Sequence, residues 1–265
     1  MKIKPLILFL SLTVLSSLLV IGCQPAQTTS SNQLTVSAAG SLQDVMKAIK
    51  PLYKEEYPNR EIVYNFASSG ALQRQIEQGA PVDVFISAAV DKMDTLEQQN
   101  LILTETRRDI LKNQIVLVTQ KGNKNNLSLT GFKDLTANAV SLIAMGEPDS
   151  VPAGKYAQEV LNSLSITDEI NAKFVYGKDV RQVLNYVETD NVEVGIFYRT
   201  DALVSDQVEI IATASEKSHS PIIYPIAMIK DSEKVELGKE FIDFLTTQEA
   251  KTVFEEYGFI PITND

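Results

Sequence analysis

The segment Leu34–Ile49 restricts the possible folds of this chain more than any other. Its first half alternates apolar and small residues, which is typical of a buried strand. Its second half, from Leu42, places apolar residues at helical spacing. Ser41 is expected to cap this helix, because a serine hydroxyl can accept hydrogen bonds from the free N–H groups of a first turn. The segment predicts a strand that enters a helix N-terminus, which offers N–H donors to an anion. Taken alone, it also fits an ordinary capped turn.

The same order of strand, small-residue turn and helix recurs along the chain. The strand Glu61–Phe66 leads through Ser68–Gly70 into a predicted helix over Ala71–Gln78, and Ala172–Tyr176 leads into a predicted helix over Val180–Glu188. Further apolar runs predict strands at Pro81–Ser87, Gln114–Thr119, Ser141–Met145, Val192–Tyr198, Val208–Ala212 and Ile223–Ile229, and further periodic segments predict helices at Asp91–Gln99, Lys155–Leu164 and Val235–Tyr257.

Strands that alternate with helices predict an α/β fold with mainly parallel sheets. Two similar groups of elements flank Gln114–Thr119, which predicts two lobes. We expect residues 34–113 plus 222–265 to form one lobe and residues 114–221 the other, with strands near 114–119 and 223–229 crossing between them. Ligands of such sheets bind at the carboxyl ends of strands, so the turns before the helices would line a cleft between the lobes.

The N-terminus has the order of a secretory signal peptide. Lys2 and Lys4 precede an apolar run over residues 5–21. The run ends in Val20–Cys23, which contains the only cysteine and resembles the lipobox of bacterial lipoproteins. This resemblance implies a signal peptide over residues 1–22, a lipid anchor on Cys23 and a flexible tether over residues 23–33, which would hold the protein at the outer side of the cell membrane. The alternative is a signal anchor with an incidental buried cysteine.

Composition argues against several classes of function. The chain has 34 acidic and 24 basic residues, a net charge of -10 that becomes -12 without Lys2 and Lys4, and no basic run that could follow a nucleic acid. The sole histidine, His219, lies in a polar turn with no cysteine to join it, so no metal ligated by the protein is expected. Phosphate-loop motifs are absent. Ser68 and Ser69 lack the G-x-S-x-G pattern of a nucleophile, so the chain is not predicted to be an enzyme.

Four segments place small or hydroxyl residues directly before a predicted helix. They are Gly40–Ser41, Ser68–Gly70, Val151–Gly154 and Lys178–Val180. Pro152 suits a first helical turn, because its missing N–H would have no partner there. Together with the hydroxyl of Tyr198 at a strand end, these turns would supply many neutral donors. Such donors suit a small oxyanion with more than one negative charge.

The residues also resemble a known family in sequence order along nearly the whole mature chain. The matching segments are Ala38–Leu42, Phe66–Ser69, Gln75–Ser87, Gly146–Gly154, Lys178–Arg181, Val194–Tyr198 and Tyr257–Phe259. They resemble the molybdate-binding proteins of bacterial ABC transporters. The resemblance implies a two-lobed periplasmic-binding-protein fold of the second topological type. It also implies that the lobes close over molybdate or tungstate and that no cofactor is needed.

The resemblance assigns ligand roles residue by residue. Ser41 and Ser69 would bind the oxyanion through hydroxyl and backbone N–H groups, Ala153 and Val180 through backbone N–H groups, and Tyr198 through its hydroxyl. Gly40 and Gly70 depart from the residues that many or some members have at these positions. These departures leave open whether Ser68 or Ser69 points inward.

The implied partners are the oxyanion, the membrane permease of an ABC importer and, through Cys23, the membrane, with the protein itself a monomer. Acidic side chains are expected to be absent from the pocket, because they would repel the ligand. Two alternatives stay open: the same scaffold binding sulfate or phosphate, and an exported hydrolase with Ser69 or Ser41 as nucleophile. The hydrolase lacks a convincing base in the sequence.

Overall fold

The computed structural model describes residues 32–122 and 127–263. The predicted signal peptide, Cys23 and most of the predicted tether lie outside these residues. Within the described residues, no helix combines the length and the apolar character needed to cross a membrane.

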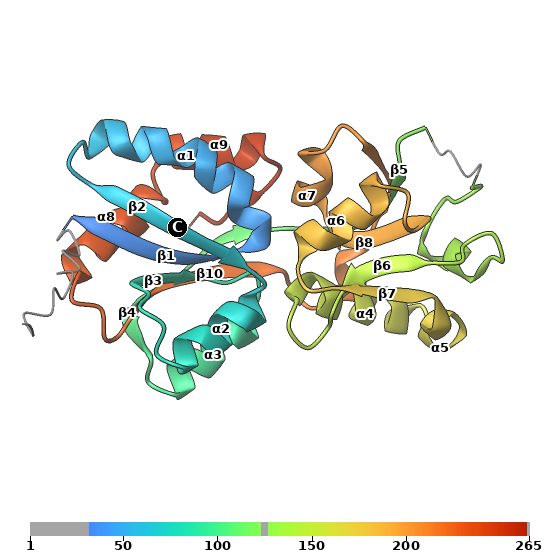
Figure 1. The fold of residues 1–265 in the computed structure, drawn as a ribbon, viewed down its shortest axis with the longest axis horizontal. Coiled ribbons are helices and arrows are strands. Elements are labelled where there is room, and N and C mark those ends of the chain that lie inside the picture. Colours follow the sequence, from blue (N-terminus) through green and yellow to red (C-terminus); the bar gives the residue numbers. More distant parts are fainter. Residues whose placement is uncertain (1–31, 123–126, 264–265) are drawn as a thin grey trace, which may run out of the picture. The chain divides into compact units, whose positions relative to one another are not determined.

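Two sheets form the framework, and each carries helices on both faces (Figure 1). The first sheet has the strand order β11-β4-β10-β3-β1-β2. Its strands are β1 (Gln33–Ala39), β2 (Glu61–Ala67), β3 (Val84–Ile86), β4 (Ile102–Lys112), β10 (Ile223–Ile229) and β11 (Ile260–Pro261). Its helices are α1 (Gln43–Glu56), α2 (Ser69–Glu77), α3 (Val90–Gln98), α8 (Val235–Phe244) and α9 (Gln248–Glu256), with the 3-10 turn η1 (Gly40–Leu42) before α1.

The second sheet has the order β7-β6-β8-β5-β9. Its strands are β5 (Ile115–Gln120), β6 (Ile143–Gly146), β7 (Phe174–Gly177), β8 (Val194–Tyr198) and β9 (Val208–Thr213). Its helices are α4 (Pro152–Ser163), α5 (Thr167–Ile170), α6 (Val180–Glu188) and α7 (Arg199–Leu203), with 3-10 turns η2 (Phe132–Thr136), η3 (Asn171–Lys173) and η4 (Glu216–Ser218). We call each sheet with its helices a lobe; the residue boundaries of the lobes stay predictions.

The apolar residues of each lobe pack on both faces of its sheet. In the first lobe, α1 and α9 cover one face, and α2 and α3 cover the other (Figure 1). In the second lobe, α4 packs on one face, while α6 packs on the other against Val116, Val118 and Ala144. A strand covered on both faces is largely apolar, and every residue of β5 is buried. Its two polar residues donate side-chain hydrogen bonds to carbonyl oxygens, Thr119 to Glu193 (3.0 Å) and Gln120 to Glu188 (2.9 Å).

The sheets are mixed, but most strands of each sheet run in one direction, so the prediction of mainly parallel sheets is confirmed. β1 runs parallel to β2 and β3, but β10 pairs antiparallel to β3 and β4. In the second sheet β6 runs parallel to β7 and β8, whereas β5 pairs antiparallel to β8 and β9. Each parallel pair has at least one helix between its strands in the chain, as a parallel connection requires.

The prediction that the strands near 114–119 and 223–229 cross between the lobes is wrong. β5 pairs only within the second sheet and β10 only within the first, so the chain changes lobes in the short connections after β4 and before β10. The sequence analysis missed β4, whose run of charged residues from Glu105 to Asp109 hides the strand pattern.

Two helices differ from their predicted bounds by three residues or more. The predicted helix over Val235–Tyr257 is two helices, because the chain breaks after Phe244 and Thr247 begins α9 by accepting a hydrogen bond from the N–H of Ala250 (3.3 Å). The apolar residues keep their helical spacing across the break, so the sequence pattern did not reveal the break. Helix α4 starts at Pro152, three residues before the predicted start, with the proline in the first turn.

Asp83 joins the N-terminal and C-terminal parts of the first lobe through three hydrogen bonds. Its Oδ2 accepts from the backbone N–H of Thr35 (2.7 Å) and from Lys234 Nζ (3.0 Å), and its Oδ1 accepts from Ser232 Oγ (2.8 Å). Because Asp83 is only 7% exposed, these donors replace the water that a carboxylate needs.

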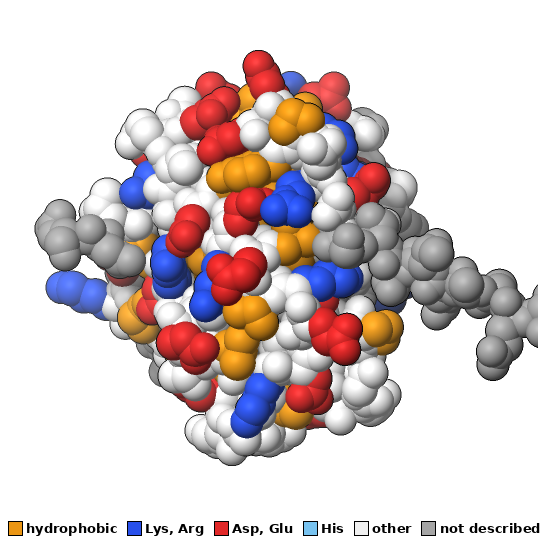
Figure 2. Space-filling model, turned by 90° about the vertical axis from the view of Figure 1, so that its left-hand side faces the viewer, with side chains coloured by type: hydrophobic (Ala, Val, Ile, Leu, Met, Phe, Trp, Pro, Cys, Tyr) orange, Lys and Arg blue, Asp and Glu red, His pale blue; other side chains and the backbone are white. Residues whose placement is uncertain are grey.

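The charged surface is mixed where it can be seen. Figure 2 shows acidic and basic side chains interspersed with small apolar groups on one face. The excess of acidic residues therefore does not gather into a single acidic patch on this face.

Candidate functional site

A small cavity lies where strand ends and helix starts of the two lobes meet. The space free of protein atoms in and around it, including open solvent at its mouth, is about 210 Å³. The residues that line it are Ala39, Gly40, Ser41, Ser68, Ser69, Ala88, Val151, Pro152, Asp179, Val180 and Tyr198. They belong to the turns after β1, β2, β3, β6 and β7 and to the last residue of β8. The four small-residue turns picked out in the sequence therefore converge on one cavity.

Four of the five predicted site residues line this cavity, namely Ser41, Ser69, Val180 and Tyr198. Ala153 does not, although it is fully buried in the first turn of α4 and its neighbours Val151 and Pro152 are part of the lining. The sequence analysis missed Ala88. The signal was present, because Ile86–Val90 is another strand end that enters a helix through small residues.

Ser41 does not cap a helix, so its predicted capping role is wrong. It lies inside η1, and the residue before α1 is Leu42, which makes no side-chain cap. The hydroxyl of Ser41 instead lies 2.9 Å from the hydroxyl of Tyr224 in β10. The 3-10 turn moves the helix start past Ser41, so its side chain is available for tertiary contacts.

Both serines of the second turn line the cavity. Ser68 caps α2, with its Oγ accepting from the N–H of Ala71 (3.4 Å). The Oγ of Ser69 accepts from the N–H of Ala88 (2.9 Å). A hydroxyl that accepts through its oxygen keeps a proton to donate, so either serine can donate to an anion.

Tyr198 is buried at the end of β8, and its hydroxyl donates to the carbonyl oxygen of Ala88 in the other lobe (3.1 Å). Burial raises the pKa of Tyr198 well above its usual value, so the phenol stays neutral. A phenol has one proton. To donate to a ligand, Tyr198 has to turn that proton away from Ala88.

The lining contains no basic side chain and one acidic one. Asp179 lines the cavity, which contradicts the expectation that acidic residues would be absent. Its Oδ1 accepts from the N–H of Gln182 (2.9 Å), because Asp179 is the N-cap of α6. In residues 32–122 and 127–263 no three His, Cys, Asp or Glu side chains are grouped so that they could hold a metal ion.

Comparison with known proteins places the chain in a family. A protein family described as "Bacterial extracellular solute-binding protein" matches residues 34–260 of this chain. The chain belongs to this family. It is therefore an extracytoplasmic solute-binding protein, and its α/β fold with two sheets confirms the predicted fold class.

Individual relatives cover nearly the whole chain. A Bacillus subtilis (strain 168) protein named "Putative ABC transporter substrate-binding lipoprotein YvgL" is 45% identical over 246 residues, which is 91% of this chain and 93% of the relative. The molybdate-binding protein ModA of Haemophilus influenzae is 35% identical over 249 residues, with 94% and 98% covered. The solved "substrate binding domain of putative molybdenum ABC transporter from Clostridium difficile" has a TM-score of 0.69 at 41% identity and covers 87% of this chain and 99% of that one.

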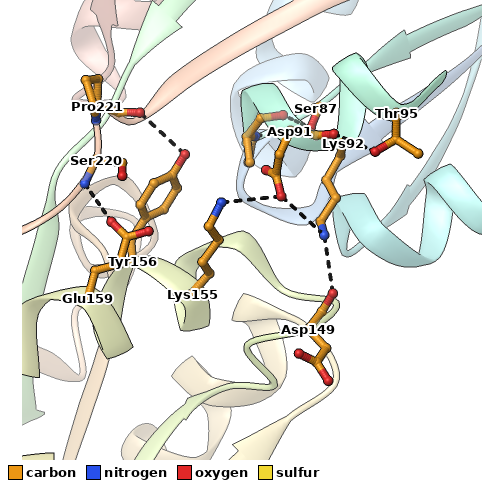
Figure 3. Close-up of polar contacts among 12 residues, drawn as sticks. Ser87, Asp91, Lys92, Thr95, Asp149, Lys155, Tyr156, Glu159, Ser220 and Pro221 are labelled. Atoms are coloured by element: carbon orange, nitrogen blue, oxygen red, sulfur yellow. Dashed lines mark hydrogen bonds and ion pairs between the residues drawn. The ribbon is translucent and has the colours of Figure 1, made fainter. Parts of the chain in front are cut away.

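Direct contacts join the two lobes of this solute-binding protein on one side of the cavity. The N–H of Gly70 donates to the carbonyl oxygen of Ser150 (3.0 Å). Figure 3 shows Lys155 of α4 pointing at Asp91 of α3, with 3.3 Å between Lys155 Nζ and Asp91 Oδ2. Beside it, Lys92 Nζ donates to the carbonyl oxygen of Asp149 (3.3 Å). The turn before α4 is thus held against α2 and α3.

On the other side, Arg181 of α6 joins the lobes. It forms an ion pair with Asp44 of α1, and its Nε lies 3.4 Å from the carbonyl oxygen of Gly40 and 3.3 Å from Asp201 Oδ1. Asp201 is fully buried in α7, and burial raises its pKa to about 7, although Arg181 opposes the shift. Arg181 forms an ion pair with Asp201 by distance only. Within the described residues, neither carboxylate oxygen of Asp201 accepts a hydrogen bond.

The two glycines that depart from the family pattern differ in the space around them. A Cβ at Gly40 would meet its nearest neighbours, Ala67 O and Val180 Cγ2, at an ordinary 3.7 Å. At Gly70 it would lie 2.7 Å from Ser150 O and 2.8 Å from Ser150 Cα. The lobes therefore approach each other at Gly70 more closely than any side chain there would allow.

Proposed function

We propose that this solute-binding protein captures molybdate or tungstate in the cavity between its lobes and delivers the oxyanion to an ABC importer. The observation that carries the proposal is the convergence of hydroxyl groups and first-turn backbone N–H groups from both lobes on a cavity without a basic side chain. Relatives named for molybdate or for ABC transport, at 35% identity and above, support the choice of ligand.

The chemistry follows from the neutrality of the donors. A dianion that enters a closed cavity loses its hydration, so each of its oxygens needs a donor already in place. Ser41, Ser69 and Tyr198 would donate through hydroxyls. Ala153 and Val180 lie in the first turns of α4 and α6, where the N–H groups have no acceptor inside the helix. Neutral donors hold the ligand without a counter-charge that would slow its release.

Closure of the lobes would complete the site and present a surface to the permease. The contacts from Gly70 to Ser150 and from Arg181 to Asp44 would form only in the closed state. Small-angle scattering tests this: the radius of gyration is expected to fall when molybdate is added, and an unchanged value would contradict the hinge.

A thermal-shift panel of molybdate, tungstate, sulfate and phosphate tests the ligand. At 100 times its dissociation constant, the right anion stabilises the folded state by about 2.7 kcal/mol. For a chain of this size such a gain raises the melting temperature by roughly 5–10 °C. A shift with sulfate or phosphate and none with molybdate would mean that the scaffold is tuned to the other oxyanion.

Two point variants test the assigned donors. Ser69→Ala and Tyr198→Phe each remove a hydroxyl from the lining and are expected to weaken molybdate binding by about 1–3 kcal/mol. The control is Ser163→Ala, whose hydroxyl donates to Val160 O near the far end of α4. Titration calorimetry measures all three, and unchanged affinity in both lining variants would refute the assignment.

Among the residues that the structure describes, the hydrolase alternative finds no histidine beside Ser41 or Ser69. His219 Nδ1 lies 2.8 Å from the carbonyl oxygen of Ser220, and its ring meets the edge of Tyr156. The hydroxyls of Ser41 and Ser69 contact Tyr224 and the N–H of Ala88. Turnover of an ester, or trapping by a serine-directed reagent, would support the hydrolase after all.

The protein would act as a monomer anchored through lipidated Cys23. The predicted tether over residues 23–33 would end before Gln33, where β1 begins. The name of the Bacillus subtilis relative includes the word lipoprotein, which supports this proposal. In cells, Cys23→Ala is expected to move the protein from the membrane fraction to the soluble fraction. Retention of the variant in the membrane would point to a signal anchor, and light scattering would report the monomer mass.

A further inference from the structure

The hydrogen bond of Ser41 is one link in a buried chain that leads away from the cavity. Ser41 Oγ lies 2.9 Å from Tyr224 Oη, and Tyr224 Oη lies 3.0 Å from Asn113 Nδ2. Tyr224 is 0% exposed near the start of β10, and Asn113, 7% exposed, lies just after β4 where the chain leaves the first lobe. Neither residue lines the cavity.

The direction of this chain is fixed at its far end. Asn113 Oδ1 accepts from the backbone N–H of Gln114 (2.8 Å), so the amide nitrogen must face the other way. That nitrogen has two protons and no acceptor capacity. It donates one proton to Thr200 Oγ1 (2.9 Å) and the other to Tyr224 Oη (3.0 Å).

The remaining protons follow from this direction. Because Tyr224 Oη accepts from Asn113, its own proton is available to Ser41 Oγ, which lies 2.9 Å away. Burial raises the pKa of Tyr224 far above its usual value, so this phenol keeps its proton. Ser41 Oγ then accepts, and its single proton is left for the cavity.

We propose that Asn113 and Tyr224 are positioning residues that hold the Ser41 hydroxyl as a donor toward the bound oxyanion. Free to rotate, a serine hydroxyl would turn its lone pairs toward the cavity for part of the time, where an oxyanion offers only acceptors. The chain Gln114 N–H to Asn113, Asn113 to Tyr224 and Tyr224 to Ser41 removes that freedom before the ligand arrives. This inference rests on the proposed oxyanion function.

A double-mutant cycle tests the inference. Tyr224→Phe keeps the ring and removes the donor to Ser41, and it is expected to raise the dissociation constant for molybdate about fivefold to tenfold, within the range of one charge-assisted hydrogen bond. In a Ser41→Ala protein the same substitution is expected to change the constant less than twofold, because no hydroxyl is left to orient. An equal factor in both backgrounds would overturn the inference, since a purely structural effect of Tyr224 does not depend on Ser41.

Asn113→Asp provides a second variant if Tyr224→Phe does not fold. A carboxylate at position 113 accepts from Tyr224, so Tyr224 Oη would accept the proton of Ser41 and the lone pairs of Ser41 would face the anion. Its added charge weakens binding in both backgrounds, but the loss is expected to be several-fold larger when Ser41 is present. Equal losses would overturn the inference. The control is Tyr53→Phe, because the Tyr53 hydroxyl donates to Glu240 instead (3.0 Å); its dissociation constant is expected to be unchanged.

The outcomes separate this inference from the proposed function. If the unmodified protein binds sulfate or phosphate instead of molybdate, the ligand assignment fails, and the cycle is measured with the anion that binds. If it binds molybdate and the cycle shows no coupling, the ligand assignment stands and the positioning role fails. If none of the four oxyanions binds, both fail.

Discussion

Gly70→Ala tests whether close approach of the lobes is needed for binding. The added Cβ would lie 2.7 Å from the carbonyl oxygen of Ser150, which is 0.7 Å short of the 3.4 Å at which ordinary contact begins. The contact is with backbone, which has no rotamer through which to give way. Overpacking of this kind costs about 1–3 kcal/mol, so the dissociation constant is expected to rise roughly 5-fold to 150-fold.

The same substitution has a different effect without ligand. If the lobes part in the free protein, position 70 no longer meets Ser150, and alanine in a helix is more favourable than glycine by up to about 1 kcal/mol. Calorimetry with molybdate and urea unfolding without it measure the two effects separately. The control is Gly131→Ala, since a Cβ at this extended residue has nothing within 4 Å. Unchanged affinity for Gly70→Ala would refute the reasoning, because the lobes would then bind ligand without this approach.

Three further predictions concern charged groups. Burial raises the pKa of Asp201 to about 7 from an ordinary 3.8, so the folded protein keeps a proton that the unfolded chain loses. Stability is therefore expected to fall as pH rises from about 4 to 7, and Asp201→Asn should flatten melting temperature across this window. Asp83→Asn is expected to lose about 1–3 kcal/mol in urea unfolding with molybdate affinity unchanged, because its contacts lie within one lobe. Lys155→Gln removes the partly exposed pair with Asp91 and is expected to raise the dissociation constant less than about fivefold, an effect that high salt should abolish; a larger, salt-insensitive change would contradict it.

Local patterns predicted the elements whose ends are set locally. The helix Val180–Glu188 has its predicted bounds, because Asp179 caps it and its apolar residues keep helical spacing. The strand Ile223–Ile229 also has its predicted bounds. In contrast, β4 contains a run of charged residues and pairs with β10, more than 100 residues later, so no local pattern showed it.

The cavity was predictable to the extent that its residues share a sequence device. Small residues between a strand and a helix indicated four turns, and all four line the cavity. Contacts made through the fold gave no such signal. Tyr224 lies near the start of a strand and Asn113 in a connection, so their link to Ser41 appears only when β10 and the end of β4 are brought together.

The position of β10 also determines the order in which the protein can be completed. β3 and β4 follow each other in the chain, yet β10 lies between them, so β4 has no neighbour on that side until residues 223–229 are available. The sheet of the first lobe therefore cannot be completed before the whole second lobe has been synthesised. The strand pairs that β10 forms with β3 and β4 join residues far apart in the sequence, which slows folding. For this protein, which works outside the cytoplasm, the sheet of the first lobe stays incomplete until nearly all of the chain has been synthesised.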